Sequence, residues 1–313
     1  IHGNIKNKTF CQEKIYVDII ASITDQFKLQ RWQVENTVKL IDEGNTIPFI
    51  ARYRKEATGA LNDEVLRNLY ERLNYLRNLE EKKEQVLASI EEQGKLTEEL
   101  KQQIEKAQTL VVVDDLYRPY RPKRRTRAII AKEKGLEPLA NLILLQQVTH
   151  PIEEEAKAYL NEEKEVHTVE GAIAGAKDII AEHISDEAAY RMHIRKQTEK
   201  EGMMLSEAKD ENAESVYEMY YHFEEPIQKL AGHRILALNR GEKEKILTVK
   251  VQAPKEKILS YLEKKVIVAQ NPYTTPVLRE AIEDSYQRLI EPAIEREIRN
   301  CLLYTSPSPR DRG

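Results

Sequence analysis

The sequence predicts a mainly α-helical protein with a small α/β element near its C-terminal end. Of its 313 residues, 33% are charged and only 6% are aromatic, and it contains 11 glycines and 12 prolines. This composition is typical of long helices with solvated, charged faces rather than of a fold built from strands and turns. Apolar residues recur at helical spacing along most of the chain, and only two short stretches have the pattern of strands. These observations argue against an all-β sandwich or barrel.

Three short helices are predicted in the first sixty residues, over 18–28, 31–43 and 47–54. In the second, apolar residues recur every three or four positions and Gly44 follows as a C-terminal stop. Pro48 suits the first turn of the third helix. We expect these helices to form a helix-turn-helix-like unit over residues 17–60.

The longest predicted helix spans residues 62–93, where leucines and valines face one way and Glu, Lys and Arg the other. Gly94 ends it. A second helix begins at about Thr97, whose hydroxyl can cap it, and acidic residues follow in its first turn. Together the two helices form a helical hairpin.

Shorter helices are predicted beyond the hairpin, over 128–134, 137–147, 151–161, 169–185, 186–200, 213–223 and 276–300. Only residues 246–251 and 265–270 have the alternating or β-branched pattern of strands. We therefore expect a helical scaffold over 61–230, and a small α/β element with a final helix over 231–300.

Both ends of the chain differ from the rest. The first residue is Ile1, and the first methionine is Met192. We expect residues 1–16 to be an untranslated or disordered flank. At the other end, residues 301–313 change abruptly to a Ser-Pro and Pro-Arg sequence that no helix continues. We expect this segment to be an artefactual tail foreign to the fold.

The composition also limits the location and chemistry of the protein. The longest unbroken apolar runs, 110–113 and 142–145, are far shorter than the roughly 20 residues of a membrane helix. Residues 1–16 lack the apolar stretch of a signal peptide. The only cysteines, Cys11 and Cys301, lie at opposite ends of the chain, which argues against disulfides and cysteine-based metal sites. We expect a cytoplasmic protein with no membrane contact, cofactor or metal.

The strongest local feature is a basic loop over residues 118–127. It carries six cations interleaved with two prolines and a tyrosine: Arg118, Arg121, Lys123, Arg124, Arg125 and Arg127, with Tyr120 among them. Prolines favour an extended loop, guanidinium groups match phosphate oxygens, and a tyrosine can stack on an unpaired base. The sequence therefore predicts phosphate contacts here. The alternative is that these cations pair with Asp114, Asp115 and the acidic helices and anchor the loop to the protein.

A second basic run, Arg52, Arg54 and Lys55, follows the third short helix. If the first sixty residues were a DNA reader, that helix would be the recognition element. The unit has few polar side chains suited to base edges, so we expect these residues to contact phosphates rather than to read sequence.

Other motifs are weaker. GAIAGAK, residues 171–177, lacks the spacing of a phosphate-binding loop, and its two glycines are better explained as a stripe that lets another helix approach closely. Acidic residues and histidines gather in two places, Glu218 with His222 and Glu225, and His183 with Glu182, Asp186 and Glu187. Such coincidences are expected among 53 acidic residues. No catalytic motif argues for an enzyme.

Three long segments carry a family resemblance. Residues 43–100 (including IPFIARYR), 114–140 (including DDLYRPYRPKRRTR) and 237–247 (ALNRGEKEKIL) closely resemble the N-terminal region of the bacterial Tex family of transcription accessory proteins. The resemblance covers about residues 17–300. It places an alternative start at Val17, and a break from the family pattern where IEREIRN gives way to the tail.

The resemblance implies cytoplasmic proteins that bind nucleic acid, RNA especially, with little sequence preference. It also implies a domain order: helix-turn-helix-like and helical regions, a YqgF-type domain, helix-hairpin-helix modules and a C-terminal oligonucleotide-binding barrel that carries much of the binding. This chain would stop before the YqgF-type domain is complete.

We therefore expect a monomeric, non-enzymatic helical scaffold that adds weak, sequence-independent binding of RNA or DNA and contacts the transcription machinery. Two alternatives remain. One is a protein-interaction scaffold whose cations are internally paired. The other is a hydrolase, which would require Glu218, His222 and Glu225 to converge in one pocket.

Overall fold

The computed structural model describes the backbone of residues 2–305 and the side chains of residues 13–303. Contacts divide the chain into two units, Ile1–Tyr117 and Arg118–Gly313. The division falls within the segment 61–230 that the sequence analysis assigns to one helical scaffold.

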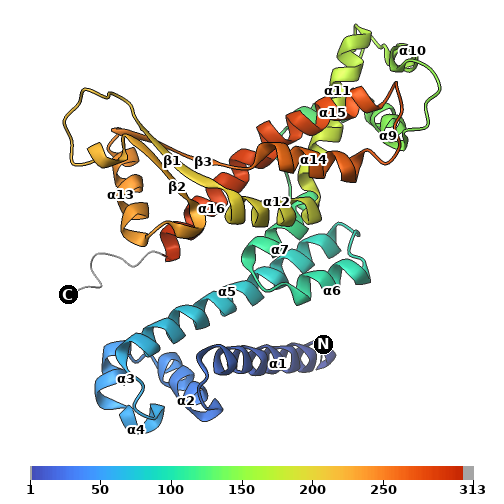
Figure 1. Cartoon of the computed structure of the whole chain (residues 1–313). Coiled ribbons are helices and arrows are strands. Elements are labelled where there is room, and N and C mark those ends of the chain that lie inside the picture. The colour runs from blue at the N-terminus through green and yellow to red at the C-terminus, as the bar shows by residue number, and fades with distance from the viewer. Residues whose placement is uncertain (1, 306–313) are drawn as a thin grey trace. The chain divides into compact units, whose positions relative to one another are not determined.

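The first unit is helical throughout (Figure 1). Its helices are α1 (His2–Phe27), α2 (Arg31–Asp42), α3 (Ile47–Tyr53), α4 (Lys55–Thr58), α5 (Asp63–Glu92), α6 (Glu98–Lys106) and α7 (Leu110–Tyr117). The helices predicted over 31–43, 47–54 and 62–93 are confirmed. The first helix is longer than its prediction over 18–28, because it continues through most of the expected flank over residues 1–16.

Helix α5 is the central helix of the first unit. The Asn62 side chain caps it by accepting a hydrogen bond from the Val65 amide at 2.8 Å. One face is buried over its whole length, from Leu66 to Ile90, against α1, α2, α3, α6 and α7. Gly94, at a φ of +66°, ends the helix. The predicted Thr97 cap of α6 is also present, since the Thr97 hydroxyl accepts from the Leu100 amide at 3.2 Å.

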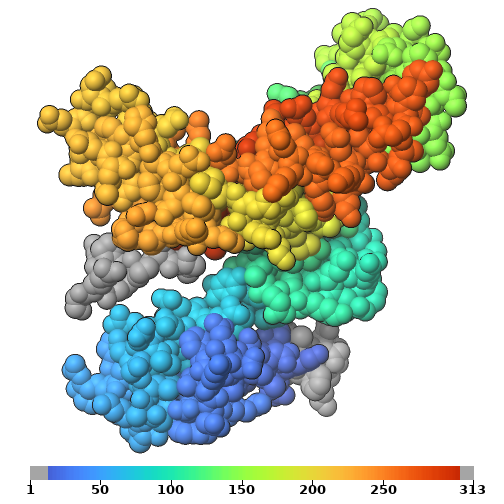
Figure 2. All heavy atoms as spheres, viewed as in Figure 1, coloured from blue at the N-terminus to red at the C-terminus, as the bar shows by residue number. Residues whose placement is uncertain are grey.

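The second unit combines helices with one small sheet. Its helices are α8 (Arg127–Glu133), α9 (Glu137–Leu145), α10 (Ile152–Ala156), α11 (Val169–Asp186), α12 (Ala188–Glu201), α13 (Gly232–Lys243), α14 (Lys255–Val266), α15 (Thr275–Asp284) and α16 (Glu291–Thr305). Between α15 and α16 lies the π-helical turn η5 (Ser285–Ile290). In Figure 2 the sheet and α13, coloured gold to orange, form a lobe separate from the green lobe of α9 and α10.

The sheet has three antiparallel strands in the order β2-β1-β3. They are β1 (Met203–Ala208), β2 (His222–Pro226) and β3 (Leu247–Gln252). In β3, Leu247, Val249 and Val251 are buried on one face and pack with α13 and α16. The strand predicted over 246–251 is therefore confirmed, and with it the mainly α fold with a small α/β element.

Two predicted elements are wrong. Residues 213–223 do not form a helix, because His222 begins β2 and pairs with Glu207 of β1. Residues 265–270 do not form a strand, because α14 extends through Val266. The backbone beyond it is held by the buried Gln146 side chain, whose amide nitrogen donates to the Val266 carbonyl at 2.8 Å. The Gln146 amide oxygen accepts from the backbone N–H groups of residues 268 and 269.

Helix α11 is the centre of the second unit, in contact with α8, α9, α10, α12, α15 and η5. Gly175 lets α8 and its following turn approach closely, since a Cβ there would lie 2.3 Å from Leu136 Cδ1 and 3.4 Å from Ala131 Cβ. Gly171 does not share this role, because its only near neighbour is the capping hydroxyl of Thr168. The close-approach interpretation is thus confirmed for one glycine of the pair.

The predicted helix over 276–300 is formed by α15, η5 and α16. Helix α16 continues to Thr305, five residues into the segment 301–313 that the sequence sets apart. Residues 306–313 of that segment lie outside the described part of the chain.

Candidate nucleic-acid interface

The basic loop opens the second unit and leads into α8. Residues 118–120 form a single 3-10 turn, and the rest of the loop is irregular as far as Thr126. The Thr126 hydroxyl caps α8 by accepting from the Ile129 amide at 3.2 Å. The prolines at 119 and 122 prevent regular helix across the loop, so its cations are distributed around a turn.

Two of the loop cations are anchored to the last turn of α11. Arg118 Nε donates to Asp186 Oδ1 at 3.1 Å, and Lys123 Nζ donates to Asp186 Oδ2. Lys123 Nζ also lies 3.6 Å from Glu182 Oε2. The Asp186 side chain is only 14% exposed, so both contacts are partly shielded from water. For these two cations the structure matches the anchoring alternative, with carboxylates from α11.

The other four cations are exposed to solvent: Arg121, Arg124, Arg125 and Arg127. Arg125 Nη2 contacts Glu133 Oε2 at 2.9 Å, a pair in which both side chains are more than half exposed and therefore weak. Within the described residues, Arg124 and Arg127 have no carboxylate within 4.0 Å. Tyr120 is half-buried, which leaves less of its ring open to a base than the sequence suggests.

The loop and α11 enclose a groove that is open to solvent, with a cavity volume of about 340 Å³. Its walls are Arg118, Arg121, Pro122, Lys123, Arg124, Arg125 and Thr126 on the loop side, and Glu182, Ser185, Asp186 and Leu289 opposite. Five basic residues thus face two acidic ones. The groove carries a surplus of positive charge in a chain whose formal net charge is -4.

The pKa of Arg118 reflects the other guanidinium groups that lie close to it. Burial lowers the pKa of Arg118, and the nearby guanidinium groups of Arg191 and Arg121 lower it further, against the opposing effect of Asp186. Arg191 is 1% exposed and its Nη2 lies 3.0 Å from Glu297 Oε1. An anion in the groove would reduce the repulsion among these groups.

A second basic surface lies on the first unit, around α3 and α4. Arg52, Arg54 and Lys55 are all exposed, and the nearest carboxylate to Arg54 is Glu56 at 3.9 Å. Two aromatic side chains that the sequence analysis did not single out lie beside them on α3. Phe49 and Tyr53 are 38% and 60% exposed, with ring centroids 5.3 Å apart. Their spacing of four on a helix whose buried residue is Ile50 is the signal that could have revealed them.

Comparisons with known proteins match two long regions of the chain. Residues 17–91 match a Tex-like protein N-terminal domain, and residues 147–306 match a region described as Tex central region-like, about half of the chain. The chain belongs to the Tex family. The first match includes the α3 surface and the second includes the α11 wall of the groove, whereas the basic loop lies between them.

Several relatives of this Tex-family chain are known. It is 50% identical to the protein YdcI of Bacillus subtilis over 280 residues, 88% of this chain and 39% of that protein. It is 45% identical to Protein tex of Bordetella pertussis over 236 residues, 74% of this chain and 30% of that protein. Against the transcriptional accessory protein Tex of Neisseria gonorrhoeae it is 41% identical over 236 residues, 74% of this chain and 31% of that protein. The chain therefore spans between 30% and 39% of the length of these relatives.

In this Tex-family chain the predicted helix over 213–223, on which Glu218 and His222 would share a face, is not formed. Glu218 lies in a short 3-10 turn and accepts from the Ser215 amide, while His222 is on β2, 74% exposed and 3.6 Å from Glu211. Glu225 pairs with Arg234 at 2.7 Å. The three side chains have separate partners, because β2 replaces the predicted helix.

The residues of the other acidic cluster, around His183, do line one hollow. Glu182, His183, Asp186 and Glu187 line a hollow of about 260 Å³ beside α9. Glu182 and Asp186 are also the carboxylates that hold Lys123. Among the residues with described side chains, no group of three His, Cys, Asp or Glu is placed to hold a metal ion.

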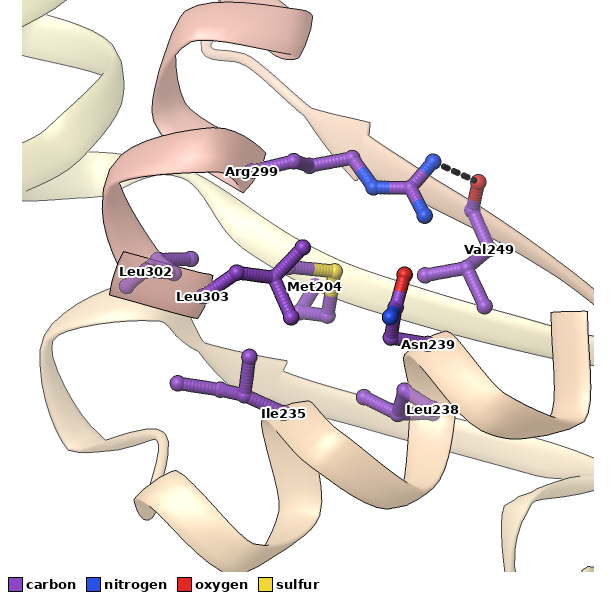
Figure 3. Close-up of a pocket in the computed structure, with 8 residues that line it drawn as sticks. All are labelled: Met204, Ile235, Leu238, Asn239, Val249, Arg299, Leu302 and Leu303. Carbon is purple, nitrogen blue, oxygen red and sulfur yellow. Dashed lines mark hydrogen bonds between the residues drawn. The ribbon is translucent and has the colours of Figure 1, made fainter. Parts of the chain in front are cut away.

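Figure 3 shows a third hollow, of about 20 Å³, between the sheet, α13 and α16. Met204, Ile235, Leu238 and Leu302 give it apolar walls, and Arg299 crosses one side to donate to the Val249 carbonyl at 3.4 Å. It is a gap in the packing of the sheet lobe. In the described part of the chain, no helix is long and apolar enough to cross a membrane.

Proposed function

We propose that this Tex-family chain contributes sequence-independent binding of nucleic acid, RNA or DNA, to a cytoplasmic transcription accessory factor. The groove between the basic loop and α11 carries the proposal, because it gathers five cations on a chain of negative net charge. Exposed Arg124 and Arg127, with no carboxylate within 4.0 Å in the described part, are suited to phosphate oxygens. Contacts of this kind position a strand without reading its sequence.

The exposed surface of α3 supports a second contact. Arg52, Arg54 and Lys55 supply charge, and Phe49 and Tyr53 supply aromatic faces on which an unpaired base can stack. The transcriptional role is supported by the printed name of the Neisseria gonorrhoeae relative, a transcriptional accessory protein. We expect the chain to act as a monomer, to bind nucleic acid weakly by itself, and to contact the transcription machinery.

The test is reversal of the loop charge. In a chain carrying Arg124→Glu and Arg125→Glu, affinity for a single-stranded RNA at about 0.1 M salt should fall by at least about tenfold. The slope of log affinity against log salt should become shallower by about 1.4, since each phosphate contact contributes about 0.7 for single strands. The matched control reverses two exposed arginines of the same unit outside the groove, Arg279→Glu and Arg296→Glu, and should retain most of the affinity and the original slope.

A protein-interaction scaffold is the second candidate, and the ion pairs of Arg118 and Lys123 with Asp186 favour it. It predicts that the loop variant and its control behave alike in the binding assay. Unchanged affinity and salt slope in the loop variant would therefore assign the loop a structural role.

A further inference from the structure

The floor of the groove contains a buried polar group, and general electrostatic attraction to a nucleic acid backbone does not explain it. Ser185 lies there, 1% exposed, and its hydroxyl has no hydrogen-bond partner among the described residues. A serine within a helix commonly donates to the carbonyl four residues earlier. That carbonyl, of Ala181, already accepts a hydrogen bond from Ser285 Oγ at 2.6 Å. A buried hydroxyl without a partner is costly, and it is one of the features that mark polar ligand sites.

The charges above Ser185 are unbalanced. Arg118 and Lys123 share the carboxylate of Asp186, and Glu182 adds a looser contact to Lys123. Arg121, Arg124 and Arg125 complete the rim, so the residues that line the groove include five basic and two acidic side chains, although Arg125 also contacts Glu133 beside the groove. Burial and neighbouring guanidiniums lower the pKa of Arg118, which agrees with a site whose cations are short of anions.

We propose that this groove is a binding site for a phosphate monoester, the group found at the end of a nucleic acid strand or on a free nucleotide. The inference rests on the proposed function because it uses the same loop. It assigns to the groove a terminal phosphate group rather than a phosphodiester within a strand. Arg118 and Lys123 bind the phosphate oxygens in place of Asp186, and the Ser185 hydroxyl lies below them. Arg121 and Arg124 bind from the rim.

Charge and shape distinguish a monoester from the diester inside a strand. A monoester has three unesterified oxygens and carries close to two negative charges at neutral pH. A diester carries one charge and is substituted on two sides, so it cannot enter a one-sided groove as deeply. The cavity volume of about 340 Å³ lies at the lower end of the range of small-molecule sites, and the open mouth of the groove leaves room for the nucleoside attached to the phosphate.

The experiment compares three unlabelled strands of one sequence as competitors for a labelled reporter strand: one with a 5′-phosphate, one with a 3′-phosphate and one with neither. A strand with a terminal phosphate should compete about tenfold better, the effect of one or two charge-assisted hydrogen bonds. The advantage should be lost in Lys123→Gln, partly kept in Lys123→Arg and fully kept in Arg279→Gln, which removes an exposed cation outside the groove. Circular dichroism checks that each variant is folded.

A second readout needs no nucleic acid. Titration with inorganic phosphate at constant ionic strength should shift the Arg118 Nε–Hε NMR signal, and the shift should diminish in Ser185→Ala. A shift without any preference among the strands identifies a free phosphate compound as the ligand, and a preference among the strands identifies a strand end. Equal competition by all three strands together with no shift of Arg118 overturns the site.

The two proposals fail differently. If Arg124→Glu with Arg125→Glu weakens every strand alike and no terminal phosphate matters, the backbone interface stands and the monoester site falls. If phosphate shifts Arg118 and no strand binds, the monoester site stands and the nucleic-acid function falls.

Discussion

The carboxylate of Asp186 lies between two cations of the basic loop, with Oδ1 3.1 Å from Arg118 Nε and Oδ2 bonded to Lys123 Nζ. In the sequence, Asp186 lies 68 positions after Arg118 and 63 positions after Lys123. One side chain at the end of α11 therefore fixes the loop and also occupies the groups best placed to bind an anion.

Asp186→Asn should separate these two roles. Without the negative charge, Arg118 and Lys123 lose their shared partner, and the free energy of unfolding should fall by about 1 to 2 kcal/mol. The groove also gains one net positive charge, so affinity for single-stranded RNA should rise about threefold to tenfold. Urea unfolding and fluorescence anisotropy measure the two effects. Glu280→Gln, which removes an exposed carboxylate paired with Lys177, is the control. Weaker RNA binding by Asp186→Asn would contradict the proposed interface.

A second set of charges gives the fold a defined response to acid. Arg288 Nη2 lies 2.6 Å from Asp284 Oδ2, and this hydrogen bond lowers the pKa of Asp284 below its ordinary value of 3.8. The stabilisation by the charged form is present above the ordinary value and is lost as the pH falls through the lowered one. Asp178 behaves oppositely, since burial raises its pKa despite the nearby Arg288, and the stability it costs is recovered as the pH falls through the raised value.

Arg288→Gln should raise the pKa of both carboxyl groups, because it removes the hydrogen bond to Asp284 and a favourable charge near Asp178. Side-chain carboxyl ¹³C NMR titration measures both values. A constant pKa for Asp284 would mean that the Arg288 contact is not formed in solution.

The close packing of α11 on α8 can be tested at Gly175. An alanine there gains about 1 kcal/mol of helix propensity but places a methyl group against the buried Leu136. We expect the overpacking to dominate, with a net loss of about 1 to 2 kcal/mol in urea unfolding. Gly171→Ala on the same helix meets only its own capping hydroxyl and should stay within about 0.5 kcal/mol of the parent chain. Equal effects at the two glycines would show that helix propensity alone decides.

Local signals in the sequence were sufficient for most helices. The Asn62 and Thr97 caps, the apolar stripe of α5 and the stop at Gly94 are all formed by neighbours within a few positions, so a single segment predicts them. The β1 and β2 segments, MMLSEA and HFEEP, contain no β-branched residue, and they become strands only because β1 pairs on both sides. The strand predicted over 265–270 is absent because the backbone of this segment pairs with the side chain of Gln146, some 120 positions away, and not with another strand.

In the candidate site, too, the sequence reveals the local features but not those that depend on distant residues. Six cations in ten residues are visible in the sequence, but Asp186, Glu182 and Ser185 form the opposite wall only because α11 folds back against the loop. No periodicity links residue 118 to residue 186. The sequence also does not reveal the exposure of Phe49 and Tyr53 on α3. Both are aromatic residues of a kind common in protein cores, yet both lie on the surface.

That surface carries the last prediction. If Phe49 and Tyr53 stack on unpaired bases, the double variant Phe49→Ala with Tyr53→Ala should weaken binding of a single strand by about fivefold to thirtyfold, since stacking contributes about 1 to 3 kcal/mol per base. Binding of a duplex of the same sequence should change less than twofold, because its bases are already stacked. Arg54, whose guanidinium carbon lies 6.0 Å from the centroid of the Phe49 ring, is unchanged in this variant and can still bind phosphates.

The control for this surface is Tyr70→Ala, which removes a 40% exposed tyrosine from α5 of the same unit. Quenching of a 2-aminopurine base in the strand provides a direct measure of stacking, and it should be lost in the α3 variant and kept in the Tyr70 variant. Equal loss of single-strand and duplex binding in the α3 variant would mean that the aromatic pair supports the fold of α3 rather than contacting bases. In that case Arg52, Arg54 and Lys55 would act through charge alone, and the salt dependence of binding would be the same for both kinds of strand.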